Sequence, residues 1–187
     1  MKIAIITGSP NTDGLTAACG NRAEQAALAA GVELLSVNLN KLKIGKCNAC
    51  GNGWGTCLEE HFCQVQDDFQ ALHQKLKEAD MFFVVTPVYW GEMSESAKAF
   101  FDRLRRCEAL NSEKSLFYNK PVVAAAAAGG SGNGTISCLE SMERLFKHMH
   151  ASIFDLITIT RKSRDYKLDT IQASAAAMIR STAGEYV

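Results

Sequence analysis

The sequence predicts an α/β fold in which a five-stranded, doubly wound parallel sheet carries helices on both faces. Apolar runs of strand length alternate with segments of helical periodicity along the chain, as in consecutive β–α–β units. These runs are continuously apolar, which is typical of strands buried on both faces. Because crossovers in such sheets are right-handed, few topologies remain, and five strands suit the order 2-1-3-4-5.

Five apolar runs predict the strands, and turn residues separate several of them from the next element. Gly8 comes after the first run, and Pro87 is expected to stop the third. The fourth run leads directly into a glycine-rich segment that begins at Gly129. The predicted strands are residues 3–7, 32–39, 81–86, 122–128 and 152–159.

Five helices are predicted from apolar spacing and terminal residues. The first is alanine-rich and ends at Gly31, and the second begins at Asp67 as its cap. In the third, Arg103, Arg105 and Arg106 are most simply a solvated face, with contact to a nicotinamide dinucleotide phosphate as the alternative. The first three helices are expected to begin at residues 14, 67 and 94, and a C-terminal helix is expected at about 168–182. The fourth helix is expected to carry the apolar residues Ile136, Leu139, Met142, Phe146 and Met149.

Length and composition limit the function classes. The 187 residues suit a single domain over 1–187, and 47% hydrophobic residues can form its core. Twenty basic and twenty acidic residues give a net charge of zero, which argues against a nucleic-acid or membrane-surface binder. No apolar run approaches the roughly 18 residues of a membrane span, and the N-terminus is predicted to be a strand, not a signal peptide. We therefore expect a cytoplasmic chain.

Three loops are expected to meet at the carboxyl ends of the strands, where such sheets bind ligands. The first, residues 8–16, is rich in hydroxyls and glycine and opens a helix, so its backbone N–H groups can cradle an anion. It lacks lysine, arginine and the P-loop pattern, which suits a phosphate held by neutral donors. An ordinary strand-to-helix turn is the alternative.

The other two loops add an aromatic wall and a glycine-rich strip. In residues 86–94, Tyr89 and Trp90 suit packing against a planar heterocycle, with a covered sheet edge or an oligomer contact as alternatives. Residues 129–134 include four glycines, which favour close approach to something flat or, alternatively, a flexible loop. Together the three loops predict one ligand with a flat ring and a phosphate tail.

Four segments of the chain resemble the flavodoxin-like, NAD(P)H-dependent FMN reductase family, namely residues 8–16, 79–91, 98–103 and 129–132. The likeness covers about residues 1–150. It implies non-covalent FMN, NADPH or NADH as electron donor, and a small-molecule acceptor such as a quinone, nitro compound or flavin. It also implies a homodimer or homotetramer. A flavodoxin-like electron carrier is the alternative, but such carriers tend to be acidic, so the zero net charge favours the enzyme.

The resemblance also assigns the binding residues. It implies that the FMN phosphate lies on the first loop and the isoalloxazine ring on the other two. The implied residues are Ser9, Asn11, Thr12, Gly14, Leu15, Thr16, Pro87, Val88, Tyr89, Trp90, Gly91, Gly129, Gly130, Ser131 and Gly132. Because the flavin carries the chemistry, no catalytic side chain is named.

A cysteine-rich insertion is predicted at residues 41–66. Its cysteines, in the spacing C-x2-C-x6-C-x5-C, are Cys47, Cys50, Cys57 and Cys63. Such density suggests a metal or iron–sulfur site, and iron–sulfur flavoproteins related to this family have cysteines here. Those proteins usually begin C-x2-C-x2-C, whereas Gly53 stands at the third position in this chain. We therefore predict reduced thiols without metal, and keep a bound metal or cluster as the alternative.

Overall fold

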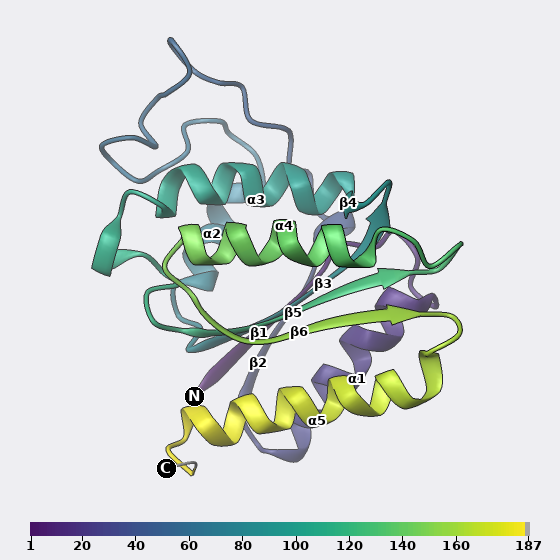
Figure 1. The fold of residues 1–187 in the computed structure, drawn as a ribbon. Helices are drawn as coiled ribbons and strands as arrows, with labels where there is room; N and C mark the ends of the chain where they lie inside the picture. The colour runs from purple at the N-terminus through teal and green to yellow at the C-terminus, as the bar shows by residue number, and fades with distance from the viewer. Residues whose placement is uncertain (186–187) are drawn as a thin grey trace.

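The computed structural model describes residues 1–185, which form a sheet between two helical layers (Figure 1). Five parallel strands have the order β2-β1-β3-β5-β6, which confirms the predicted topology. A sixth, short strand, β4, pairs antiparallel with β3. The strands are β1 (Lys2–Thr7), β2 (Glu33–Asn38), β3 (Met81–Tyr89), β4 (Glu92–Met93), β5 (Pro121–Ala128) and β6 (Ser152–Thr160).

Five α-helices cover the sheet, and each face has its own apolar core. Helices α2, α3 and α4 lie over one face, and α1 and α5 lie over the other (Figure 1). Side chains alternate along β1, so that Ala4 and Ile6 join the first core while Ile3 and Ile5 join the second. The helices are α1 (Leu15–Ala29), α2 (Phe69–Leu76), α3 (Glu95–Glu108), α4 (Thr135–His148) and α5 (Arg164–Thr182). None of these helices has the length and apolarity to cross a membrane.

Strand β3 continues through Pro87, so the expectation that this proline stops the strand is wrong. Thr7, the last residue of β1, pairs with Val85, and β3 then continues beside β5 with Pro87 opposite Ala127. Because β1 ends at Thr7, the part of β3 after Val85 has no neighbouring strand on that side. No backbone N–H is needed there to pair with a neighbour, so proline is tolerated. Helix α5 also begins a turn earlier than expected, at Arg164, because its first turn is exposed and has no apolar period.

The insertion lies outside these layers. After a 3-10 turn at Leu39–Lys41, residues 42–68 contain no helix or strand. In Figure 1 this segment extends beyond α3 as an irregular loop. The carboxyl ends of β1, β3, β5 and β6 meet at a different edge, beside the starts of α1 and α4 (Figure 1).

Candidate functional site

A cavity of about 430 Å³ lies where the first loop meets the ends of β3, β5 and β6. Its volume is in the range of small-molecule sites. No carboxylate lines it, and two arginines do. The lining residues are Ser9, Asn11, Gly14, Leu15, Thr16, Pro87, Val88, Tyr89, Ala127, Gly129, Gly130, Arg161 and Arg164.

The start of α1 forms one wall of this cavity. Its N-cap is Gly14, whose lack of a side chain leaves the first-turn N–H groups without a side-chain cap. Ser9 and Thr16 are buried beside it, at 5% and 4% exposure, and the Ser9 hydroxyl accepts a hydrogen bond from Asn11 N–H. An uncapped helix start lined by hydroxyls is a site for an anion.

A second cavity of about 480 Å³ adjoins the first and shares Val88, Gly129 and Gly130 with it. The two cavities lie next to each other along the carboxyl edge of the sheet, from α1 to the start of α4. The second cavity is lined by Val88, Trp90, Gly91, Ala128, Gly129, Gly130, Ser131, Gly132, Asn133, Gly134 and Ser137.

The glycines of the third loop differ in what surrounds them. A Cβ added at Gly129 or Gly130 would meet no protein atom within 4 Å, so the space over these residues is open. A Cβ at Gly134 would lie 2.7 Å from the Gly91 Cα, and the φ of Gly134 is +78°. Gly134 is therefore required by the fold, whereas Gly129 and Gly130 leave room for a flat group.

The aromatic pair lies at the end of the β3–β4 hairpin, with Tyr89 as the last residue of β3 and Trp90 in the turn. Trp90 has φ +54° and its partner in the turn, Gly91, has φ +83°, as in a type I′ turn. A bulky residue with positive φ is strained, and such strain clusters at functional sites. Trp90 is fully exposed and Tyr89 is 41% exposed. The alternative that this pair covers the sheet edge is therefore excluded.

The structure brings the predicted residues together, with one exception. All of the expected site residues line one of the two cavities apart from Thr12, which lines neither. Sequence reasoning missed the cations: the first loop has none, as expected, but Arg161 and Arg164 reach the same cavity from the β6–α5 junction. The sequence could have indicated these two arginines, because both come after the carboxyl end of a predicted strand.

Ser94 joins the first two loops. Its hydroxyl donates to the Gly8 carbonyl at 2.6 Å and accepts from Ala97 N–H at 3.4 Å as the cap of α3. Its own N–H donates to the Thr86 hydroxyl at 3.0 Å. Ser94 and Thr86 are both buried, so these bonds hold the loops in register without help from water.

Replacing Ser94 with alanine is therefore expected to lower the free energy of unfolding by about 2 kcal/mol, since a helix cap and a buried acceptor both lose their partner. Urea unfolding followed by circular dichroism measures this. Ser96, a half-buried residue of the same turn that does not cap α3, is the matched control: it lies 3.4 Å from the Gly8 carbonyl, and its hydroxyl accepts a 2.9 Å hydrogen bond from Asn40 Nδ2. Equal losses for the two alanine variants would contradict the role given to Ser94.

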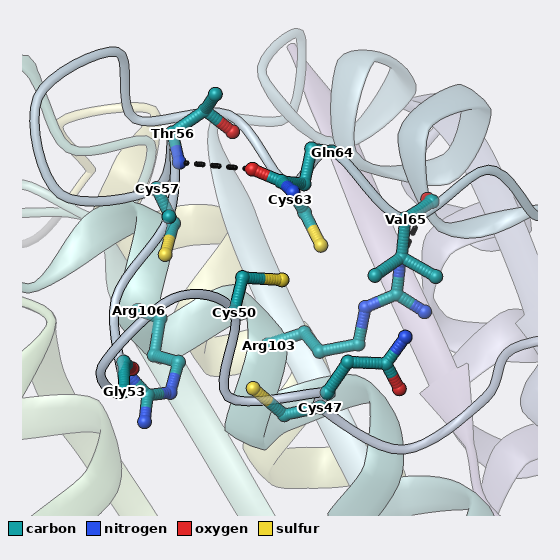
Figure 2. A pocket seen from close by; sticks show the side chains of 12 residues that line it. Cys47, Cys50, Gly53, Thr56, Cys57, Cys63, Gln64, Val65, Arg103 and Arg106 are labelled. Atoms are coloured by element: carbon teal, nitrogen blue, oxygen red, sulfur yellow. Dashed lines mark hydrogen bonds between the residues drawn. The ribbon is translucent and has the colours of Figure 1, made fainter.

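A separate pocket gathers the four cysteines of the insertion. All four are reduced and half-buried, and they line one cavity of about 20 Å³ together with Arg103 and Arg106 (Figure 2). Among residues 1–185, however, no three His, Cys, Asp or Glu side chains are arranged to hold a metal ion. His61 bonds the Cys107 carbonyl through Nδ1 instead. The other cysteines, Cys19, Cys107 and Cys138, are buried packing residues.

Arg103 closes the base of the insertion, so its prediction as a solvated residue is wrong. It is 1% exposed and donates to both Asp67 carboxylate oxygens, at 2.6 and 3.0 Å. It also donates to the carbonyls of Gly45 and Val65, and its guanidinium lies 4.3 Å from the Phe69 ring centroid. We call this set of contacts the Arg103 clasp. The apolar periodicity of α3 could not predict this burial, because the guanidinium is covered by the insertion, a loop without periodic sequence.

Arg106 is also engaged by the insertion. It donates to the Gly53 carbonyl at 2.7 Å and lies over the Trp54 ring at 4.4 Å. Lys98 and Asp102, by contrast, form an exposed pair on α3, as a solvent face should. Arg103 and Arg106 of α3 thus line the cysteine pocket and neither of the edge cavities.

The Arg103 clasp makes the free energy of unfolding depend on pH at low pH. Burial disfavours the charged form of Asp67, but hydrogen bonds from Arg103 and from the Gly45 and Phe69 N–H groups outweigh it and hold its pKa below the usual 3.8. The clasp should stabilise the fold fully above pH 3.8 and lose its contribution as pH falls through the lower folded-state pKa.

We therefore expect the difference in unfolding free energy between wild type and Asp67→Asn to shrink as pH falls. Urea unfolding at about pH 7 and at steps below about pH 4 measures this difference. The comparison with Asp67→Asn removes the parallel contribution of Glu108, whose pKa is also lowered, because hydrogen bonds from His73 and Leu116 N–H outweigh its burial. A difference that does not change with pH would contradict the account.

Comparisons with known proteins give the chain's relatives. A family model described as NADPH-dependent FMN reductase matches residues 1–160. An iron-sulfur flavoprotein of Methanosarcina thermophila is 33% identical over 134 residues, which are 72% of this chain and 66% of that protein, just under two thirds of its length. The structure of a flavone reductase matches with a TM-score of 0.74 at 15% identity, covering 97% of this chain and 63% of that one. The apo structure of an NADH:FMN oxidoreductase matches with a TM-score of 0.67 at 16% identity, covering 96% and 89%.

Proposed function

This chain belongs to the NADPH-dependent FMN reductase family, and from that premise we propose that it passes electrons from NADPH or NADH through bound FMN to a small acceptor. A quinone, a nitro compound or free flavin is the class of acceptor that we propose. The observation that carries the proposal is the pair of neighbouring edge cavities, which place an uncapped helix start beside an open glycine strip.

The residues present fit FMN at both ends. The first-turn N–H groups of α1, with Ser9 and Thr16, would hold the phosphate. The open backbone at Gly129 and Gly130 would lie along the isoalloxazine ring. When bound, FMN supplies hydride acceptance and electron delivery. The chain's part is to bind and orient the ring, and backbone N–H groups beside it would stabilise negative charge. No side-chain acid or base is assigned.

Flavin binding and reduction test the proposal separately. Purified protein is titrated with FMN under fluorescence, and the loaded protein is then mixed anaerobically with NADPH or NADH while flavin absorbance is monitored. We expect saturable quenching, then bleaching and steady turnover with a quinone. Binding without bleaching by either dinucleotide would instead support the electron-carrier alternative. Absence of FMN binding would contradict the proposal as a whole.

A second candidate function concerns the cysteine pocket. The four thiols fit an iron–sulfur or metal group in kind and number, since thiolate ligands suit both. Arg103, whose buried Nε has no hydrogen-bond partner among the described residues, is one of the residues that line this pocket. Because the cavity has room for about one water-sized group, loading would require the loop to adjust. We infer that the insertion is a thiol site able to take up iron or zinc, in addition to the FMN site.

Metal and sulfide analysis decides this second candidate. Protein purified without oxygen is assayed for iron, zinc and acid-labile sulfide, with thiols titrated in parallel. Iron with sulfide would indicate a cluster, and metal without sulfide would indicate a thiolate-bound ion. Metal-free protein in which all seven cysteines titrate as thiols would overturn the metal site and support the prediction of reduced thiols.

A further inference from the structure

Two arginines outside the predicted binding loops face the phosphate end of the edge site. Arg161 comes directly after β6 and Arg164 is the first residue of α5, and both line the cavity formed by the first loop. Helix α5 packs beside α1 on the same face of the sheet, which brings the two helix starts together (Figure 1). The junction thus delivers two guanidinium groups opposite the α1 N-terminus.

These guanidinium groups have no competing partner within residues 1–185: no ion pair or hydrogen bond engages the side chain of Arg161 or Arg164. No carboxylate lines the cavity either, so its formal charge comes from the two arginines alone. Asp13, the acid of the first loop, is exposed and lies outside the lining. A cavity with two unpaired cations, buried hydroxyls and a free helix start is built for a dianion.

The position of Arg164 has independent support from α1. Burial raises the pKa of the Cys19 thiol, one turn into α1, to about 12, and the positive charge of Arg164 acts in the opposite direction. The Arg164 guanidinium is therefore near enough to α1 to be felt there. Both arginines are exposed to solvent, so their charge can attract an anion toward this cavity.

We propose that Arg161 and Arg164 form a cationic wall that binds the phosphate monoester of FMN against the N-terminus of α1. This assignment rests on the proposed function and adds to it the residues that select FMN over riboflavin. It replaces the expectation of a phosphate held by neutral donors alone. Guanidinium groups suit this role because they offer paired donors to phosphate oxygens.

The test compares FMN with riboflavin, which differ by the phosphate. Each is titrated into the wild type, Arg161→Gln/Arg164→Gln and Lys162→Gln, with flavin fluorescence as the readout. The double variant is expected to bind FMN about 30-fold more weakly, on the scale of charged hydrogen bonds. Its riboflavin affinity should stay within about 2-fold of wild type, which also reports correct folding. Lys162→Gln, a neighbouring charge that lies outside the lining, should leave FMN binding unchanged.

Salt provides a second readout. FMN affinity of the wild type should fall more steeply than that of the double variant as salt is raised, because exposed charges are screened. A double variant that binds FMN like the wild type would overturn the assignment, and a selective rise in KM for NADPH over NADH would then place the arginines at the dinucleotide's phosphate. Wild-type protein that binds neither flavin would overturn the proposed function, and this assignment with it.

Discussion

Replacing Gly130 with valine is expected to weaken FMN binding by more than about 100-fold, because branched methyl groups would occupy the space proposed for the flavin ring. The substitution meets no protein atom within 4 Å of the new Cβ, and Gly130 does not have positive φ. The fold should therefore tolerate it. Fluorescence titration with FMN measures the loss, and thermal unfolding without flavin should give the same midpoint as wild type.

Gly134→Ala is the converse variant of the same loop. Its Cβ would lie 2.7 Å from the Gly91 Cα, at a φ of +78°, so we expect the unfolding free energy to fall by about 2 kcal/mol or more. The two variants thus separate a ligand effect from a folding effect. A Gly130→Val protein that binds FMN normally would show that the ring lies elsewhere.

Replacing Arg103 with glutamine is expected to lower the unfolding free energy by about 3–5 kcal/mol, the usual cost of removing one partner from a buried ion pair. The Asp67 carboxylate would lose its counter-ion, and the carbonyls of Gly45 and Val65 would lose their donor. Because these groups lie at both ends of the insertion, its cysteines should also react faster with a thiol reagent. Urea unfolding and thiol-modification rates measure the two effects.

Arg105→Gln is the matched control, since Arg105 lies on the same helix and takes no part in the Arg103 clasp. It should change the unfolding free energy by less than about 0.5 kcal/mol. Loss of stability with unchanged thiol reactivity in Arg103→Gln would show that the arginine supports α3 without ordering the cysteine pocket.

Sequence periodicity predicted the sheet order because each buried strand is a continuous apolar run, and the carboxyl-edge rule then gathered three separate loops at one site. It failed at Pro87, because whether a proline ends a strand depends on the neighbouring strand, which here ends at Thr7. That information lies in the pairing and not in the local sequence.

The arginines show the same limit for side chains. Arg103 has the helical position of a solvated residue, but a loop with no period folds over it and supplies Asp67. Arg161 and Arg164 lie far in sequence from the first loop, and the packing of α5 beside α1 brings them to its cavity. Both the Arg103 clasp and the cavity at the start of α1 depend on charged residues that are distant in sequence. Apolar patterns carry little information about where such residues meet.

The structure of this chain with FMN bound would test the central claim most directly. The account predicts electron density for one flavin along the edge of the sheet, with its phosphate at the start of α1 between Ser9 and Arg164, and its ring over Gly129 and Gly130. Flavin density at any other place, or a phosphate pointing away from α1 toward the β3–β4 hairpin, would contradict it.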